Sequence, residues 1–137
     1  MDPRTELALE RAGYARPFEH TARALHLNEL CRWDLALVMT APQKQTLLRM
    51  IDQMPPGMTA PDVLLWGSFD PKQPVNAEDI DLEVPDPWYR GQKAFDRTVT
   101  RMQRAVPSMI LHLRGRLERM EREGSDEDPS AEEARLD

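Results

Sequence analysis

The pattern of apolar and polar positions along the chain predicts three helices and two strands. Two short continuous apolar runs, residues 35–39 and 63–66, are typical of strands buried on both faces, as in a parallel sheet. Between them Thr40, with Gln43 three positions later, predicts the start of a helix through a capping box. Apolar residues then recur at steps of three and four over residues 95–120, which predicts a long helix with an apolar stripe.

Cap and turn residues complete this picture. Asp2 before Pro3 predicts an N-cap with proline at the first helical position, and Gly13 predicts the end of that first helix. A short helical turn is expected at residues 27–32. Residues 69–90 hold four prolines and are expected to be mostly loop, and a loop of that length favours a functional site. The order helix, strand, helix, strand, helix defines an α/β protein.

Charge divides the chain into two parts. Its 137 residues bound it to one domain with a net charge of −6. Residues 121–137 hold eight acidic and two basic side chains, whereas the other 120 residues hold 16 of each. This composition predicts a domain over residues 1–120 and a disordered acidic tail over residues 121–137. The neutral body offers no electrostatic case for binding nucleic acid or an anionic membrane.

The single cysteine and the scattered histidines limit the possible chemistry. Cys31 excludes an intrachain disulfide, suits a reducing cytoplasm, and lies on an apolar helical face, which predicts a buried, inert thiol. No apolar run approaches the roughly 20 residues that span a bilayer, and the N-terminus has no signal-peptide character, so a cytoplasmic protein is expected. His20, His26 and His112 lack ligand spacing, and the glycines do not cluster. No metal and no cofactor are therefore expected.

The segment Asp86-Pro87-Trp88-Tyr89 is the strongest candidate for chemistry. An Asp-Pro turn followed by two aromatic residues places a carboxylate beside a flat apolar wall. Such a carboxylate suits protonation of a leaving group next to a bound aromatic ring. Judged alone, an Asp before Pro is more often a turn former, and Trp88 and Tyr89 are more often packing residues.

Five short segments resemble the low-molecular-weight protein-tyrosine phosphatases in the same order and spacing, over roughly residues 2–114. They are Asp2-Pro3-Arg4, His20-Thr21-Ala22-Arg23, Asp34-Leu35-Ala36-Leu37-Val38-Met39, Gly67-Ser68-Phe69-Asp70-Pro71, and Val84-Pro85-Asp86-Pro87-Trp88-Tyr89-Arg90-Gly91. The resemblance implies a three-layer domain with a parallel sheet and a long C-terminal helix. It also implies that Asp86 is the general acid that protonates the leaving phenolate. Trp88 and Tyr89 would then wall the entrance for a phosphotyrosine ring.

The same resemblance implies what these 137 residues lack. The family's nucleophile loop, a Cys followed six positions later by an Arg, has no counterpart here, and neither has the first strand of its sheet. An acid without a nucleophile and a phosphate clamp cannot run the phosphatase mechanism, so an inactive, truncated phosphatase-like domain is expected. A complete domain would act on a phosphotyrosine protein or a small phosphate monoester. An arsenate reductase of the same fold would need redox cysteines besides Cys31.

An alternative function is interaction with another chain. Without the first strand, the strand at residues 35–39 becomes an exposed apolar edge, which invites pairing with a partner chain or a second copy. The stripe over residues 95–120 also has a period close to seven, as in a coiled-coil seam, although a helix packed on a small sheet is the more ordinary interpretation. The chain would then be a non-catalytic interaction module or a dimerising remnant of the fold.

Overall fold

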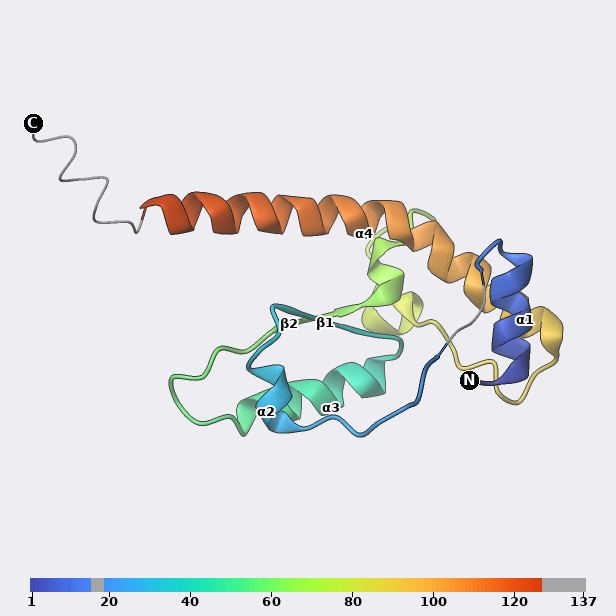
Figure 1. Cartoon of the computed structure of the whole chain (residues 1–137), viewed down its shortest axis with the longest axis horizontal. Helices are drawn as coiled ribbons and strands as arrows, with labels where there is room; N and C mark the ends of the chain where they lie inside the picture. Colours follow the sequence, from blue (N-terminus) through green and yellow to red (C-terminus); the bar gives the residue numbers. More distant parts are fainter. Residues whose placement is uncertain (16–18, 127–137) are drawn as a thin grey trace, which may run out of the picture. The chain divides into compact units, whose positions relative to one another are not determined.

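The computed structural model describes residues 1–15 and 19–126 and has the mixed α/β order that the sequence predicts (Figure 1). The helices and strands are α1 (Pro3–Arg11), α2 (Leu27–Leu30), β1 (Leu35–Val38), α3 (Ala41–Asp52), β2 (Asp62–Leu65) and α4 (Gln92–Asp126), with 3-10 turns η1 (Trp66–Phe69) and η2 (Asp79–Leu82). The chain divides into two compact units, Met1–Val106 and Pro107–Asp137. Among the described residues, no helix is long and apolar enough to cross a membrane.

The predicted helix caps are confirmed. The Asp2 carboxylate accepts a hydrogen bond from the Arg4 amide at 2.8 Å and so caps α1, and Gly13 takes φ +94° just beyond the end of that helix. The Thr40 hydroxyl accepts from the Gln43 amide, and the Gln43 side chain accepts in return from the Thr40 amide. This capping box starts α3 directly after β1.

The two strands form a parallel pair whose register runs from Leu35 opposite Asp62 to Val38 opposite Leu65. Every second residue of each strand is buried: Ala36, Val38, Val63 and Leu65. These side chains form one apolar cluster with Leu30 of α2 and Leu47 of α3. A right-handed crossover through a helix is the usual way to join neighbouring parallel strands, and α3 is the helix that connects them.

The prediction that the strands are buried on both faces is wrong. Leu35 and Leu37 of β1 are only half-buried, and burial along the strand alternates. The apolar cluster places α2 and α3 against one face of the sheet, the face that carries Ala36 and Val38. An all-apolar strand sequence shows that both faces can be buried, but it does not show what covers them.

A second apolar cluster joins α1 to the beginning of α4. Ala8 packs with Phe95 and Val99, and all three side chains are buried. Trp66 of η1 adds a polar link to the same part of α4, because its indole N–H donates to the Met102 carbonyl at 3.1 Å. The first unit is thus held together by contacts between segments far apart in the sequence.

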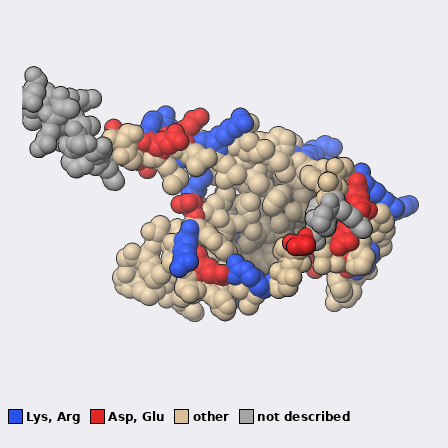
Figure 2. Space-filling model, in the orientation of Figure 1, with Lys and Arg blue, Asp and Glu red and all other residues tan. Residues whose placement is uncertain are grey.

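Helix α4 continues through Pro107 without interruption and ends at Asp126. Residues 121–126, which composition assigned to a disordered tail, are therefore helical, and residues 127–137 of that predicted tail lie outside the described residues. Glu118 and Arg122 stand four positions apart, a spacing that stabilises a helix whatever its net charge. Figure 2 shows acidic and basic side chains interspersed along the second half of α4.

Candidate functional site

The loop that carries Asp86 runs from η2 to α4 and is attached to the carboxyl end of β1. The Val84 amide donates to the Met39 carbonyl at 2.8 Å, one residue beyond the strand. The Ala41 amide, at the first position of α3, donates to the Glu83 carboxylate at 2.8 Å. Ligands of open parallel sheets usually bind outside the carboxyl ends of the strands, and the loop with Asp86 lies beside that edge of this sheet.

Asp86 is held in an Asx turn with its carboxylate at the surface. Its Oδ1 atom accepts from the Trp88 amide at 2.9 Å, and the residue is exposed. Trp88 is 55% exposed and Tyr89 is 96% exposed. The structure therefore places the three predicted site residues together on one loop, with both aromatic residues exposed to solvent.

Arg4 supports this loop from α1, a role that the sequence analysis missed. Its guanidinium lies over the Phe95 ring at 4.3 Å and over the Trp88 ring at 5.3 Å. Its Nη1 atom donates to the carbonyls of Trp88 at 3.0 Å and Arg90 at 3.1 Å. The carboxylate of Asp2 accepts from the same guanidinium; these hydrogen bonds lower the pKa of Asp2 and raise the pKa of Arg4. The Asp-Pro-Arg motif thus caps a helix and clamps the loop at residues 83–91 that carries the predicted acid Asp86, here named the acid loop.

An ion pair between a buried carboxylate and a partly exposed arginine fixes the turn that follows β2. The Arg104 guanidinium donates to both oxygens of Asp70, at 2.8 Å from Nε and 2.7 Å from Nη2. The Lys72 amide adds a third hydrogen bond at 2.9 Å, and Asp70 is only 4% exposed. Chiefly because Arg104 donates to it, the pKa of Asp70 is lowered to about 2. Sequence spacing gives no signal of this pair, since 34 residues separate its members.

Close packing at Gly67 joins the same turn to η2. A Cβ atom at Gly67 would lie 2.0 Å from the carbonyl oxygen of Leu82, a distance that no side chain tolerates. Gly67 is therefore required here for close approach of two backbone segments. The contact brings η2, and with it the start of the acid loop, next to the end of β2.

Cys31 has the surroundings of a structural thiol, although it is half-buried rather than buried as predicted. Its Sγ atom donates to the Asn28 carbonyl at 3.0 Å, and the residue caps the C-terminal end of α2. Among residues 1–15 and 19–126, no group of three or more His, Cys, Asp or Glu could hold a metal ion.

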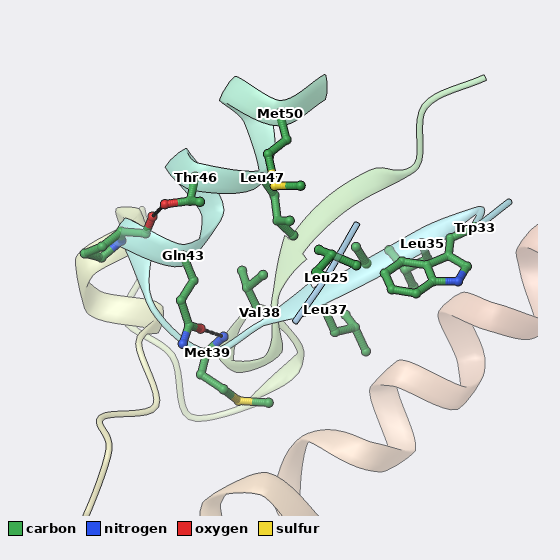
Figure 3. A pocket seen from close by; sticks show the side chains of 12 residues that line it. Leu25, Trp33, Leu35, Leu37, Val38, Met39, Gln43, Thr46, Leu47 and Met50 are labelled. Carbon is green, nitrogen blue, oxygen red and sulfur yellow. Dashed lines mark hydrogen bonds between the residues drawn. The ribbon is translucent and has the colours of Figure 1, made fainter. Parts of the chain in front are cut away.

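An open apolar groove of about 890 Å³ follows β1 (Figure 3). It is lined by Leu25, Trp33, Leu35, Ala36, Leu37, Val38, Met39, Pro42, Gln43, Thr46, Leu47 and Met50. In Figure 3, Val38 points toward Leu47 of α3, whereas Leu37 projects from the opposite face of the strand. Trp33 is exposed, and the groove presents aliphatic, aromatic and thioether groups to solvent.

The backbone of β1 has an open edge along this groove. The Asp62 amide donates to the Asp34 carbonyl at 3.1 Å, and hydrogen bonds of a parallel pair come from alternate residues. The amide and carbonyl groups of Leu35 and Leu37 consequently point away from β2. Within the described residues the sheet has two strands, so nothing pairs with this edge.

The protein is an α/β protein with an Asp-Pro-aromatic loop at the carboxyl edge of its parallel sheet. Comparison with known proteins identifies its family. The family model described as low molecular weight phosphotyrosine protein phosphatase matches residues 1–123. The chain belongs to this family, which confirms the resemblance seen in the sequence.

Two known proteins illustrate the similarity and its extent. A low molecular weight protein-tyrosine-phosphatase of Streptomyces coelicolor is 31% identical over 117 residues, which cover 85% of this chain and 66% of that protein. The crystal structure of Primo-1 is similar in fold, with a TM-score of 0.59 at 23% identity, over 76% of this chain and 61% of that one. The chain thus spans slightly less than two thirds of the length of each.

Proposed function

We propose that this chain supplies the general-acid side of a phosphotyrosine phosphatase site, with Asp86 as the acid. The observation that carries the proposal is the position of an exposed Asp86 carboxylate at the carboxyl edge of a parallel sheet. Trp88 and Tyr89 flank it with exposed rings, a suitable wall for the aromatic ring of a phosphotyrosine side chain. A protonated Asp86 would donate to the leaving phenolate oxygen, and the carboxylate so formed would then activate water.

The proposal includes inactivity of residues 1–137 alone. No Cys in this sequence is followed six positions later by an Arg, since Leu37 stands in that position after Cys31. General acid catalysis contributes about 10² to 10⁴ in rate, whereas enzymatic accelerations reach ~10²¹ for phosphate monoesters. The difference must come from a nucleophile and a preorganised phosphate clamp, which other polypeptide must supply.

Reconstitution tests this proposal. The purified chain is assayed with p-nitrophenyl phosphate, alone and after addition of a polypeptide that carries the Cys-x5-Arg loop of a family member. No turnover is expected from the chain alone, and turnover that depends on Asp86 is expected from the mixture. Asp86→Asn should lower the rate of the mixture about 10² to 10⁴-fold, whereas Asp52→Asn, an exposed carboxylate at the end of α3, should leave it unchanged. Turnover by the chain alone that Cys31→Ser abolishes would contradict the proposal.

The second candidate function is pairing with another chain through the open edge of β1. The supporting observation is the coincidence of unpaired backbone at Leu35 and Leu37 with the apolar groove. Edge strands of this kind pair readily with an added strand, which gains backbone hydrogen bonds and buries apolar surface. In the second unit, Ile110, Leu113, Leu117 and Met120 are exposed at coiled-coil spacing and offer a separate surface for a second copy.

Size-exclusion chromatography with light scattering separates these possibilities. A dimer through the strand edge should dissociate in Leu37→Lys, which puts a charge beside the open backbone, and persist in Leu48→Lys, an exposed leucine of α3 outside the groove. A dimer through the helical stripe should instead dissociate in Leu117→Lys. A folded monomer at micromolar concentration would rule out self-association as the function of either surface.

A further inference from the structure

The beginning of α3 is occupied by a side chain of the acid loop. The Ala41 amide, at the first position of the helix, donates to the Glu83 carboxylate at 2.8 Å. Pro42 has no amide hydrogen, and the Gln43 amide donates to the Thr40 hydroxyl. The beginning of a helix attracts anions, because its first amides lack partners within the helix. Here the anion is Glu83, so this helix end holds the acid loop.

Contacts on either side of Glu83 follow the turn from β1 to α3 in order. Asp79 of η2 accepts from the Lys44 ammonium at 3.1 Å. The Val84 amide donates to the Met39 carbonyl at 2.8 Å, and Val84 is buried. Glu83 lies between these two contacts and is half-buried. The segment from η2 to Val84 is therefore attached to the carboxyl edge of the sheet at three successive points.

Asp86 lies between two anchors of the acid loop. Two residues before it, the Val84 amide is bonded to the end of β1, and two residues after it, the Trp88 carbonyl accepts from the Arg4 guanidinium at 3.0 Å. Asp86 itself is exposed, and its hydrogen bond to the Trp88 amide lies within the loop. A general acid must stay within hydrogen-bond reach of its leaving group, so the anchors decide whether this carboxylate is in place.

We propose that Glu83 is a positioning residue that holds Asp86 at the carboxyl edge of the sheet. It does so through two interactions with α3. The hydrogen bond from the Ala41 amide to a carboxylate is stronger than one between neutral groups, and the negative charge is attracted to the positive end of the helix. The consequence for catalysis rests on the proposed function of Asp86, whereas the anchoring itself concerns the chain alone.

Hydrogen exchange of the full chain, without any added polypeptide, tests the anchoring. Glu83→Ala should accelerate exchange of the Val84 and Trp88 amides about ten- to a hundredfold, the effect of losing a hydrogen bond to a charged group. Glu83→Gln keeps an oxygen that can accept from the Ala41 amide but loses the charge, so an acceleration of only about two- to fivefold is expected. Glu118→Ala, which changes an exposed glutamate of α4, should affect neither amide.

Turnover of the reconstituted mixture tests whether this anchor positions the acid. Phenol is a poorer leaving group than p-nitrophenol and depends more on protonation, so a misplaced acid slows phenyl phosphate more. Glu83→Ala should therefore lower kcat for phenyl phosphate about tenfold more than kcat for p-nitrophenyl phosphate, with KM unchanged. Glu83→Gln should restore most of this loss. A residue that only stabilises the fold would lower both rates by the same factor.

The two measurements separate this inference from the proposed function. If the wild-type mixture showed no turnover, the proposed function would be wrong, and hydrogen exchange of the chain alone would still decide whether Glu83 anchors the loop. Equal exchange of the Val84 and Trp88 amides in Glu83→Ala and Glu118→Ala would overturn the inference. Equal factors of loss for the two substrates in an active mixture would also overturn it, because Glu83 would then support the fold without directing the acid.

Discussion

Replacement of Asp70 by Asn should destabilise the first unit by about 2 kcal/mol at pH 7. The Asp70 pKa is about 2 in the folded chain against 3.8 for a carboxyl group without such partners, and each pKa unit corresponds to about 1.36 kcal/mol. Loss of a fully buried ion-pair partner costs roughly 3–5 kcal/mol, but about a third of the Arg104 side chain is exposed and can regain water. The smaller value is therefore expected.

The sign of the pH dependence follows from the direction of the shift. Because folding lowers the pKa of Asp70, its contribution is fully present above pH 3.8 and is lost as the pH falls toward 2. The difference between the wild-type chain and Asp70→Asn should consequently shrink to about half its neutral value near pH 3. Acidification alone should therefore remove the same contribution to the free energy of unfolding that the substitution removes.

Urea denaturation followed by circular dichroism measures both quantities. The midpoint should fall in Asp70→Asn without a change in the dependence on urea, since the surface exposed on unfolding stays the same. Asp52→Asn, which changes an exposed carboxylate, should have no effect above about 0.5 kcal/mol. If Asp70→Asn were as stable as Asp52→Asn at pH 7, the ion pair with Arg104 would not be a source of stability.

Two further substitutions test the packing around the loop. Gly67→Ala should lower the stability of the first unit by more than about 2 kcal/mol, because its Cβ atom would lie 2.0 Å from the Leu82 carbonyl. In comparison, Gly115→Ala inside α4 should stabilise the helix by about 1 kcal/mol. Thermal denaturation compares the two variants. Arg4→Lys keeps the charge but loses the guanidinium plane over the Trp88 ring, so amide hydrogen exchange of residues 86–91 should accelerate several-fold. Unchanged exchange would show that the loop does not depend on Arg4.

Local signals of the sequence predicted the caps and the positions of the helices and strands well. The Asp2 and Thr40 caps and the Gly13 turn each depend on residues within three positions of one another, so spacing alone specifies them. The length of α4 was underestimated. Residues 121–126 were judged by their acidic composition, whereas (i, i+4) pairs of opposite charge stabilise a helix there. Helix-forming residues continue the helix to Asp126 despite the accumulation of negative charge.

Contacts across the fold could not be predicted in this way. The Arg4 guanidinium meets the Trp88 carbonyl across 84 positions, and Asp70 meets Arg104 across 34. No periodicity encodes such pairs, since they depend on which segments the fold brings together. The half-burial of Leu37 has the same origin: its apolar character was evident, but the segment that would cover it is not specified by the strand itself.

The supports of the acid loop all lie within the first unit, and this decides what a reconstitution experiment measures. Arg4 comes from α1, the Met39 carbonyl from the end of β1, and Phe95 from the beginning of α4. The loop therefore takes its conformation without any contribution from a nucleophile loop. Activity gained on addition of a Cys-x5-Arg polypeptide would then report docking of that polypeptide rather than folding of the acid loop. Leu37→Lys puts a charge at the open edge of β1, where the added polypeptide would pair. It should therefore abolish the gain in activity while leaving hydrogen exchange around Asp86 unchanged. If Leu37→Lys abolished activity and also accelerated hydrogen exchange of the loop, the loss of activity would instead reflect a change in the fold of the first unit.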